Sequence, residues 1–382
     1  MKLKNLKEKA MLILMSTLLF TFCKQKEVEK YAKHVGNKDI IKENIFLDSI
    51  RLNINNNSNN YFVKEIDSKI YFIDKLFAII KVYNSEGILE NTFLGKKNFP
   101  QMGELYSISY LQNYFYITDN IFIYKFDRKF NLLESSKIHF KPNILDIDTE
   151  NPNPEQIMFY QLNYGAMKSY QGFNNKLIIP IEMELPNLNA FNTNKYYKIA
   201  YNFALLNITS FKVEKLFNNW PSSYSENKNY PFLTSNSYYL KNKKIYINHE
   251  ADTSVYLVDT ALNTLFKFGF KPEEFKNDYK ETTKLSDAFD SELPLKFKNE
   301  YGYFKQLITN DDKIAVRFFK TGKNNSNHLG VQVYKEFNLV NEFILDKDLE
   351  VIGYIAPYFL FYKNNTSYED KLTIFRLKIN YD

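Results

Sequence analysis

The chain of 382 residues is poor in cysteine, tryptophan and histidine, with one Cys, one Trp and four His. Because Cys23 has no second cysteine to pair with, a disulfide within the chain is excluded, and the fold must rest on its core. The four histidines are scattered and form no zinc-binding motif: His34, His139, His249 and His328. We therefore expect neither a bound metal ion nor a cofactor.

Linear signatures of catalysis are also missing. The sequence contains no G-x-S-x-G nucleophile motif, no P-loop and no dinucleotide fingerprint. The pattern Asp146-x-Asp148-x-Glu150 has the alternating carboxylates of a calcium loop, but Asn151 stands where that loop needs glycine. Enzymatic activity is thus not indicated, although a site can also be assembled from single residues that lie far apart in the sequence.

Charge of one sign is not dominant either. Lys and Arg total 50 against 44 Asp and Glu, which gives a formal net charge of +6. No dense run of Lys and Arg marks a surface for a polyanion. We therefore expect no nucleic-acid partner.

The start of the chain has the layout of a bacterial lipoprotein signal. Four lysines within residues 1–9 precede an uncharged, mainly apolar run over residues 10–22, and Cys23 follows directly. The run is shorter than the about 20 residues that a membrane-spanning helix needs, which disfavours an N-terminal anchor helix. Phe22 departs from the small residue usual before the cleavage site, and a plain secretory signal remains the alternative. We predict a signal peptide over residues 1–22, lipidation at Cys23 and a charged tether over residues 23–43.

A repeated hairpin pattern dominates the remaining sequence. Residues 69–74 alternate as a strand, a short polar turn follows, and a second strand ends at Asn84. Residues 244–248 and the strand ending at Asp259 repeat this pattern, and the same interval separates Ile70 from Asn84 and Ile245 from Asp259. Further copies begin near the following positions: Tyr114, Lys176, Lys313 and Tyr358.

Six β-meanders of three or four strands predict an all-β fold, a six-bladed β-propeller over residues 44–382. The last copy ends with too few residues for a complete blade, and residues 44–53 have the pattern of a strand. We therefore expect this N-terminal strand to close the last blade. A β-sandwich or a pair of all-β domains is the alternative architecture.

Insertions between strands are where a rigid propeller would place binding residues. Trp220 and Tyr224 lie in a polar loop and suit contact with a sugar ring or a partner pocket, unless Trp220 packs under its own loop. His249 and Asp252 lie in the first turn of a repeat, where a solvated role is the alternative. The insertion over residues 271–299 carries aromatic and aliphatic side chains at roughly helical intervals, which predicts a short surface helix.

The chain resembles a known family in its lipoprotein start, its φ-Tyr-φ-φ-Asp hairpins and its segment Tyr301-Gly302-Tyr303-Phe304 leading to Lys313 and Phe318. These features together look like the uncharacterised six-bladed β-propeller lipoproteins of Bacteroidota, of the domain-of-unknown-function 4221 type. The charged stretch after Cys23 is similar to that of surface-exposed lipoproteins from the same group. The resemblance implies a propeller in the cell envelope, periplasmic or surface-exposed on the outer membrane, and it supplies no catalytic residues.

These observations favour a non-enzymatic envelope lipoprotein that binds a protein or glycan partner through one face of the propeller. The partner would be an outer-membrane protein or a glycan, and the membrane would be contacted through the N-terminal lipid. The alternative is an envelope hydrolase or lyase with its site at the central channel. Convergent carboxylates in that channel would favour the enzyme, and an aromatic face would favour binding.

Overall fold

The computed structural model describes residues 33–38, 45–55, 57–98, 100–119, 122–140, 153–163, 168–183, 185, 187–191, 193–225, 229–281, 285–310, 313–322, 328–345, 347–363 and 370–379. The predicted signal peptide, Cys23 and the pattern from Asp146 to Glu150 lie outside these residues. No helix within the described ranges is long and apolar enough to cross a membrane.

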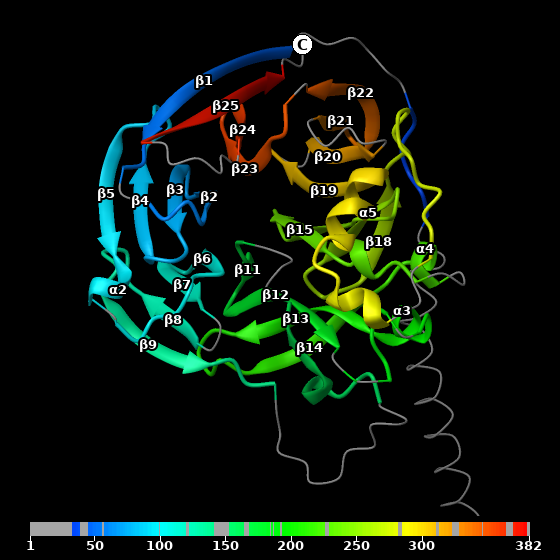
Figure 1. Ribbon diagram of the computed structural model, residues 1–382, viewed down its shortest axis with the longest axis horizontal. Helices are drawn as coiled ribbons and strands as arrows, with labels where there is room; N and C mark the ends of the chain where they lie inside the picture. Colours follow the sequence, from blue (N-terminus) through cyan, green and yellow to red (C-terminus); the bar gives the residue numbers. More distant parts are fainter. Residues whose placement is uncertain are drawn as a thin grey trace, which may run out of the picture.

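Six antiparallel sheets surround a common centre as the blades of a propeller (Figure 1). The prediction of an all-β, six-bladed propeller is therefore confirmed. Blades 1 and 2 have four strands each: β2 (Tyr61–Ile66), β3 (Lys69–Asp74), β4 (Ile79–Tyr83) and β5 (Leu89–Leu94), then β6 (Ser107–Leu111), β7 (Tyr114–Thr118), β8 (Phe122–Phe126) and β9 (Leu132–Lys137). Blade 3 has five strands: β10 (Tyr160–Leu162), β11 (Gly172–Phe173), β12 (Lys176–Met183), β13 (Tyr201–Asn207) and β14 (Val213–Asn219).

The remaining blades are four-stranded. Blades 4 and 5 are formed by the following strands: β15 (Asn236–Lys241), β16 (Lys244–His249), β17 (Val255–Asp259) and β18 (Thr264–Phe268), then β19 (Tyr301–Thr309), β20 (Ile314–Gly322), β21 (Leu329–Lys335) and β22 (Asn338–Leu345). Blade 6 combines both ends of the propeller: β23 (Glu350–Ile355), β24 (Tyr358–Tyr362), β25 (Lys371–Ile379) and β1 (Ile45–Asn53).

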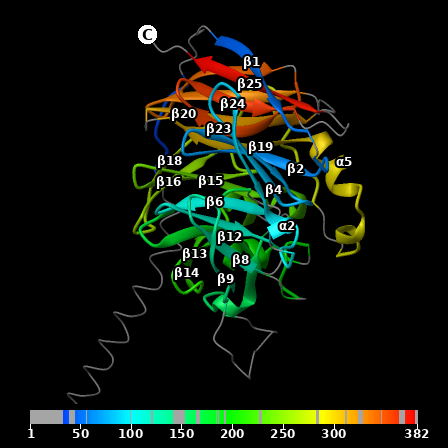
Figure 2. The same ribbon diagram turned by 90° about the vertical axis from the view of Figure 1, so that its left-hand side faces the viewer.

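The ring is closed by β1, which forms the outer strand of blade 6 (Figure 2). It pairs antiparallel with β25 along its whole length, from Ile45 opposite Ile379 to Asn53 opposite Lys371. The predicted closure by the N-terminal strand is thus confirmed. This pairing joins the two ends of the propeller through a continuous ladder of backbone hydrogen bonds.

Residues 33–38, which belong to the predicted tether, lie against blades 4 and 5. His34 forms a parallel bridge with Lys267 on β18, and Lys38 forms another with Leu339 on β22. Backbone bonds of 2.8 Å from Val35 to Lys267 and of 2.9 Å from Leu339 to Asn37 support these bridges. This short segment covers part of the outer edges of two neighbouring blades, where unpaired backbone groups would otherwise be exposed.

The aspartates that mark the repeat have a structural role in the hairpins. Asp74, at the end of β3, accepts hydrogen bonds from the backbone N–H of Ser58 and of Phe77. Asp119, at the corresponding place after β7, accepts from the backbone N–H of Gly103 at 2.9 Å and of Phe122 at 2.7 Å. Each carboxylate therefore holds its hairpin turn and ties it to the segment that enters the blade.

Neighbouring blades pack through alternate side chains of the same strand. On β3, Phe72 contacts the cluster that includes Leu360 and Ile374 of blade 6, whereas Ile73 contacts the cluster that includes Ile117 of blade 2. Successive side chains of a strand point to opposite faces of the sheet, so each blade is buried on both sides. The core is a ring of apolar layers between blades.

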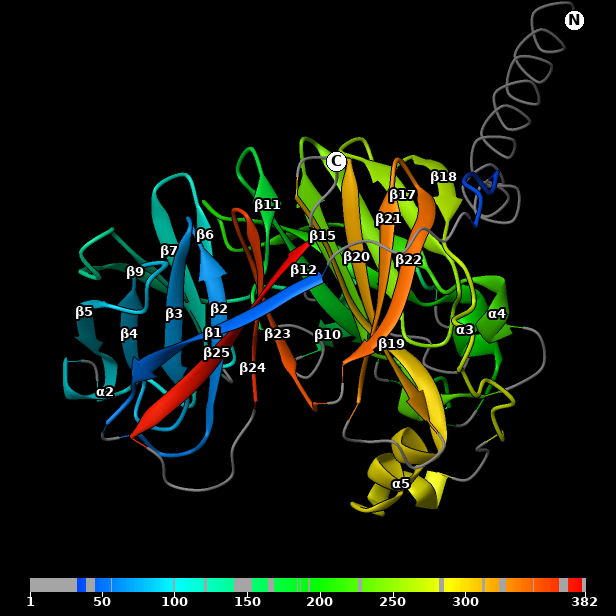
Figure 3. The same cartoon turned by 90° about the horizontal axis from the view of Figure 1, so that it is seen from above.

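Short helices occupy the connections: α2 (Gly95–Asn98), η1 (Ile157–Phe159), α3 (Lys195–Ile199), α4 (Ser222–Ser225), η2 (Pro231–Leu233), η3 (Leu285–Phe289) and α5 (Leu293–Glu300). Helix α5 lies on one face of the disc, and the β11 turn lies on the opposite face (Figure 3). The insertion over residues 271–299 was predicted to carry a short surface helix, and it contains η3 and all but the last residue of α5. Phe275 and Tyr279 precede both helices in non-helical chain and are buried.

Candidate functional site

A cavity of about 450 Å³ lies at the centre of the propeller. It is bounded by strands β2, β19 and β23, by the chain around β15 and by α5, so separate blades contribute to one site. Its lining combines tyrosines with charged and hydroxyl side chains: Tyr61, Lys64, Lys168, Ser235, Ser237, Glu250, Lys298, Tyr303, Lys305, Gln306, Glu350 and Tyr362. This size is typical of a pocket for a small molecule or a short polymer segment.

One side of this central cavity is formed by a segment that crosses from blade 2 to blade 4. The backbone N–H of Ile108 on β6 donates to the carbonyl of Lys168 at 3.1 Å. Three residues later, the N–H of Gln171 donates to the hydroxyl of Tyr238 on β15 at 2.7 Å. The crossing segment, residues 168–171, thereby brings Lys168 to the cavity wall.

The two carboxylates of the central cavity are held by lysines. Glu250 accepts a hydrogen bond from Lys298 on α5 at 2.6 Å and another from the backbone N–H of Ser235 at 3.0 Å. Burial raises the pKa of Glu250, and the attraction of Lys298 opposes this rise. Glu350 accepts a hydrogen bond from Lys305 at 2.7 Å. Both carboxylates are therefore engaged in ion pairs rather than available as an acid–base couple.

Two further lysines line the same cavity without such partners. Within the described ranges, the ammonium groups of Lys64 and Lys168 form no hydrogen bond and no ion pair. The pKa of Lys64 is lowered to about 8, chiefly by desolvation. Attraction from Glu350 opposes this fall, whereas repulsion from Lys168 and Lys305 adds to it. Desolvation also lowers the pKa of Lys168. The cavity wall therefore concentrates positive charge.

These lysines were not identified from the sequence. The available signal was a charged residue within an inner strand, since Lys64 on β2 and Lys305 on β19 each follow directly on apolar or aromatic residues. The position of Lys168 depends on contacts with Ile108 and Tyr238, which are distant in sequence, and no local pattern indicates it.

The four residues predicted to bind a partner gather between blades 3 and 4. Ring centres of Trp220 and Tyr224 are 4.8 Å apart, and Trp220 is 5.9 Å from His249. Asp252 accepts hydrogen bonds of 3.0 Å from the hydroxyls of Ser223 and Tyr256. Their proximity was not evident from the sequence, where the loop of Trp220 and the turn of His249 are separate.

All four predicted binding residues are buried. The exposed fraction is 6% for Trp220, 0% for Tyr224, 1% for His249 and 6% for Asp252. The ring of His249 bonds to the amide oxygen of Asn236 at 2.7 Å, and desolvation lowers its pKa to about 4. Tyr224, His249 and Asp252 are therefore buried residues that do not line the central cavity, whereas Trp220 lines a second cavity.

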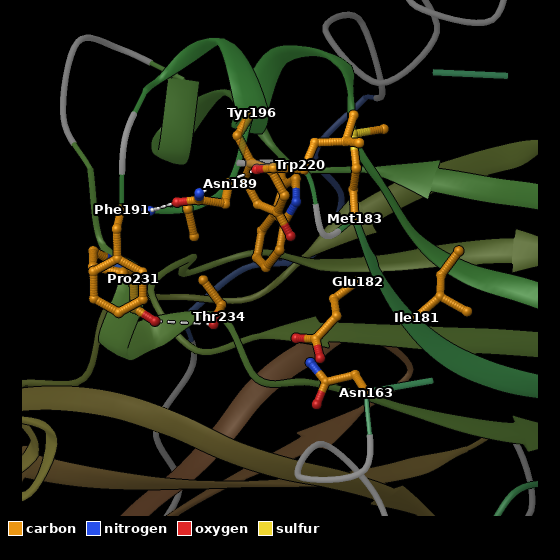
Figure 4. Close-up of a pocket in the computed structure, with 12 residues that line it drawn as sticks. Asn163, Ile181, Glu182, Met183, Asn189, Phe191, Tyr196, Trp220, Pro231 and Thr234 are labelled. Atoms are coloured by element: carbon orange, nitrogen blue, oxygen red, sulfur yellow. Dashed lines mark hydrogen bonds between the residues drawn. The ribbon is translucent and has the colours of Figure 1, made fainter. Parts of the chain in front are cut away.

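The Trp220 cavity has a volume of about 420 Å³. Aromatic and aliphatic side chains form much of its wall, together with a few polar groups: Asn163, Ile181, Glu182, Met183, Leu185, Asn189, Ala190, Phe191, Tyr196, Trp220, Pro231 and Thr234. Figure 4 shows Tyr196 and Trp220 close together, with Glu182 and Asn163 on another side of the cavity. The indole N–H of Trp220 is buried and has no hydrogen-bond partner among the described residues.

The Trp220 cavity and the central cavity are neighbours. Thr234 lines the first and Ser235, the next residue, lines the second. Helices η2 and α5 also meet here, since the ring centres of Phe232 and Phe297 are 5.5 Å apart. One face of the propeller thus combines an aromatic cavity with a lysine-rich one.

The fold and its axial cavity define a six-bladed β-propeller, and solved structures share this architecture. The chain is similar to a member of the DUF4221 family from Bacteroides vulgatus, with 13% identity, a TM-score of 0.65 and coverage of 89% of this chain and 99% of that one. It is also similar to a putative exported protein from Bacteroides fragilis, with 12% identity, a TM-score of 0.53 and coverage of 91% and 100%. The resemblance to the domain-of-unknown-function 4221 type is thus confirmed at the level of the fold.

No protein-family model and no curated protein matches the sequence.

Proposed function

We propose that this protein is an exported β-propeller lipoprotein without catalytic activity, and that it binds a glycan through the face that carries α5. The observation that carries this proposal is the pair of neighbouring cavities, one lined by Thr234 and the other by the next residue, Ser235. Concave sites of this size suit a chain of sugar rings better than a flat protein surface.

The chemistry of the Trp220 cavity supports a sugar as the ligand. A sugar ring has apolar C–H faces and a rim of hydroxyl groups, so it needs an aromatic or aliphatic wall together with a few polar side chains. The aromatic wall is formed by Tyr196, Phe191 and Trp220, and the polar side chains are those of Asn163 and Glu182. The buried indole N–H of Trp220 lacks an acceptor in the described part of the chain, and a ligand oxygen would remove that cost.

The charge pairing in the central cavity supports binding rather than hydrolysis. A glycoside hydrolase needs two carboxyl groups that act on opposite sides of the scissile bond. Here Glu250 and Glu350 are each bound to a lysine, Lys298 and Lys305. Export and membrane tethering rest on the predicted lipidation of Cys23, and the similarity to a putative exported protein from Bacteroides fragilis agrees with this proposal.

The test is binding of purified residues 24–382 to an array of bacterial and plant glycans, followed by calorimetry with any ligand found. We expect Trp220→Phe, which removes only the indole N–H and part of the ring, and Glu182→Gln to weaken binding on the order of 10-fold. Glu134→Gln, on the exposed edge strand β9, is the matched control and should bind as wild type.

Two results would overturn the proposal. In the first, no glycan binds, and crosslinking in the envelope recovers a protein in stoichiometric amount. This result would assign the α5 face of the propeller to a protein partner. Release of shortened glycan products on incubation, detected by mass spectrometry, would establish the enzymatic alternative.

A further inference from the structure

We propose that the central cavity is an anion-binding subsite, in which Lys64 and Lys168 hold a carboxylate, phosphate or sulfate group of an acidic glycan. This inference deepens the proposed function and rests on it for the identity of the glycan. The site is defined by geometry: lysines from β2, the crossing segment, β19 and α5 converge on one cavity.

The balance of charge in the cavity leaves room for an anion. Lys298 is paired with Glu250, and Lys305 is paired with Glu350. Within each pair, the positive and the negative charge neutralise each other. Lys64 and Lys168 remain as two ammonium groups that repel each other, with no hydrogen bond to any described residue. Like charges brought together in a poorly solvated cavity are costly unless a counter-charge binds.

Nothing in the fold itself requires this arrangement. Lys64 lies on β2 between the buried core residue Val63 and the half-buried Glu65, and its side chain lines the cavity without an ion-pair partner among the described residues. Lys168 is brought in by backbone bonds of the crossing segment, which do not depend on its side chain. Two charges retained at such positions are typical of a functional site, where stability is given up for binding.

The adjoining Trp220 cavity favours a sugar as the carrier of the anion. Because consecutive residues, Thr234 and Ser235, line the two cavities, we propose that an acidic polymer segment places a neutral ring beside Trp220 and its anionic group beside Lys64. Tyrosines on the wall of the central cavity, Tyr61, Tyr303 and Tyr362, suit contact with a ring as well. An acidic peptide would not offer a ring edged with hydroxyl groups to Asn163 and Glu182 in the Trp220 cavity.

The experiment is calorimetric titration of residues 24–382 with trigalacturonate, with inorganic phosphate, with inorganic sulfate and with neutral trigalactose. We expect trigalacturonate to bind at least 10-fold more tightly than trigalactose. Lys64→Gln and Lys168→Gln should each weaken binding of the acidic probe on the order of 10- to 100-fold, the loss of one charged hydrogen bond. Lys69→Gln, on the neighbouring strand β3 with an exposed side chain, is the control and should bind as wild type.

A second readout separates binding from folding. Without ligand, Lys64→Gln and Lys168→Gln should melt at the same temperature as wild type or higher, because each removes a repulsion. With ligand, the order should reverse, because wild type binds the anion more tightly and gains more stabilisation from it than the variants do. A purely structural role for these lysines predicts lower melting temperatures under both conditions.

The proposal is overturned if acidic and neutral probes bind equally, or if the lysine variants bind trigalacturonate as wild type does. If neutral glycans still bind in that case, the proposed function stands and only the anion subsite is lost. If phosphate or sulfate binds through Lys64 and Lys168 while no glycan does, the subsite stands and the glycan assignment fails. Binding of an acidic peptide in preference to trigalacturonate would replace the glycan by a protein partner.

Discussion

Arg376 on β25 donates hydrogen bonds of 2.7 Å from both Nε and an Nη to the two carboxylate oxygens of Asp48 on β1. The two residues are directly opposite in the strand register, and the guanidinium also lies 4.7 Å from the ring centre of Tyr358. A planar, two-point contact therefore fixes the N-terminal strand against the last strand of the propeller. The ring is closed by side chains as well as by the backbone ladder.

Asp48→Asn should lower the free energy of unfolding by about 1–3 kcal/mol, because it replaces a partly buried charged contact by a weaker neutral one. Denaturant unfolding of the purified propeller measures this change. Glu90→Gln is the control, since the ion pair of Glu90 with Lys69 is solvent-exposed and should contribute less than about 1 kcal/mol. Equal effects of the two substitutions would contradict a special role for the Asp48 contact.

Leu52→Ala should destabilise the closed ring by about 2–5 kcal/mol, since Leu52 on β1 is fully buried between blades 1 and 6. Arg51, the residue before Leu52, has an exposed side chain, and Arg51→Ala should change the free energy of unfolding by less than about 0.5 kcal/mol. Denaturant unfolding of both variants tests whether β1 belongs to the cooperative core. If Leu52→Ala unfolds like wild type, β1 is a peripheral strand.

His249 should make the protein less stable in mild acid. Its buried ring has a pKa of about 4 in the folded state, below the usual value of 6.5, so the unfolded chain binds the proton more readily. The neutral ring therefore stabilises the fold above about pH 6.5, and up to about 3 kcal/mol is lost as the pH falls to about 4. Asp252 attracts a proton to this ring, and Arg317 repels it.

The measurement is the free energy of unfolding of wild type and of His249→Asn between pH 7 and pH 4. The raised pKa of Glu250 contributes a slope of opposite sign in both proteins, so the difference between them isolates the histidine. We expect wild type to lose more stability than the variant over this range. Parallel curves would mean that His249 does not titrate differently on folding.

The fold could be predicted from the sequence because its signals are local. Alternation in residues 69–74, with Asp74 and Asn84 at the turns, identifies a hairpin without knowledge of the rest of the chain. The repeat then makes a closed ring the natural solution, and the missing strand at the C-terminal end points to β1.

The site could be predicted only in part, because its residues meet through long-range contacts. Trp220 was identified by its polar loop, and it does line a cavity. Lys64 and Lys168 became neighbours of Glu350 only once the ring was assembled, and the crossing segment is positioned by β6 and β15. No periodicity or motif carries information of this kind.

Cys23→Ala should leave the propeller folded but released from the membrane or retained as an unprocessed precursor. The reason is that lipidation needs the thiol, whereas the strands of the six blades are formed by residues 45–379. Detergent partitioning of cell envelopes, with mass spectrometry of the N-terminus, distinguishes these outcomes from a lipidated protein. Phe22→Ala supplies the complementary control: it places a small residue before the cleavage site and should give processing at least as efficient as wild type. A Cys23→Ala protein that is still cleaved and still bound to the membrane would show that the anchor is not the predicted lipid.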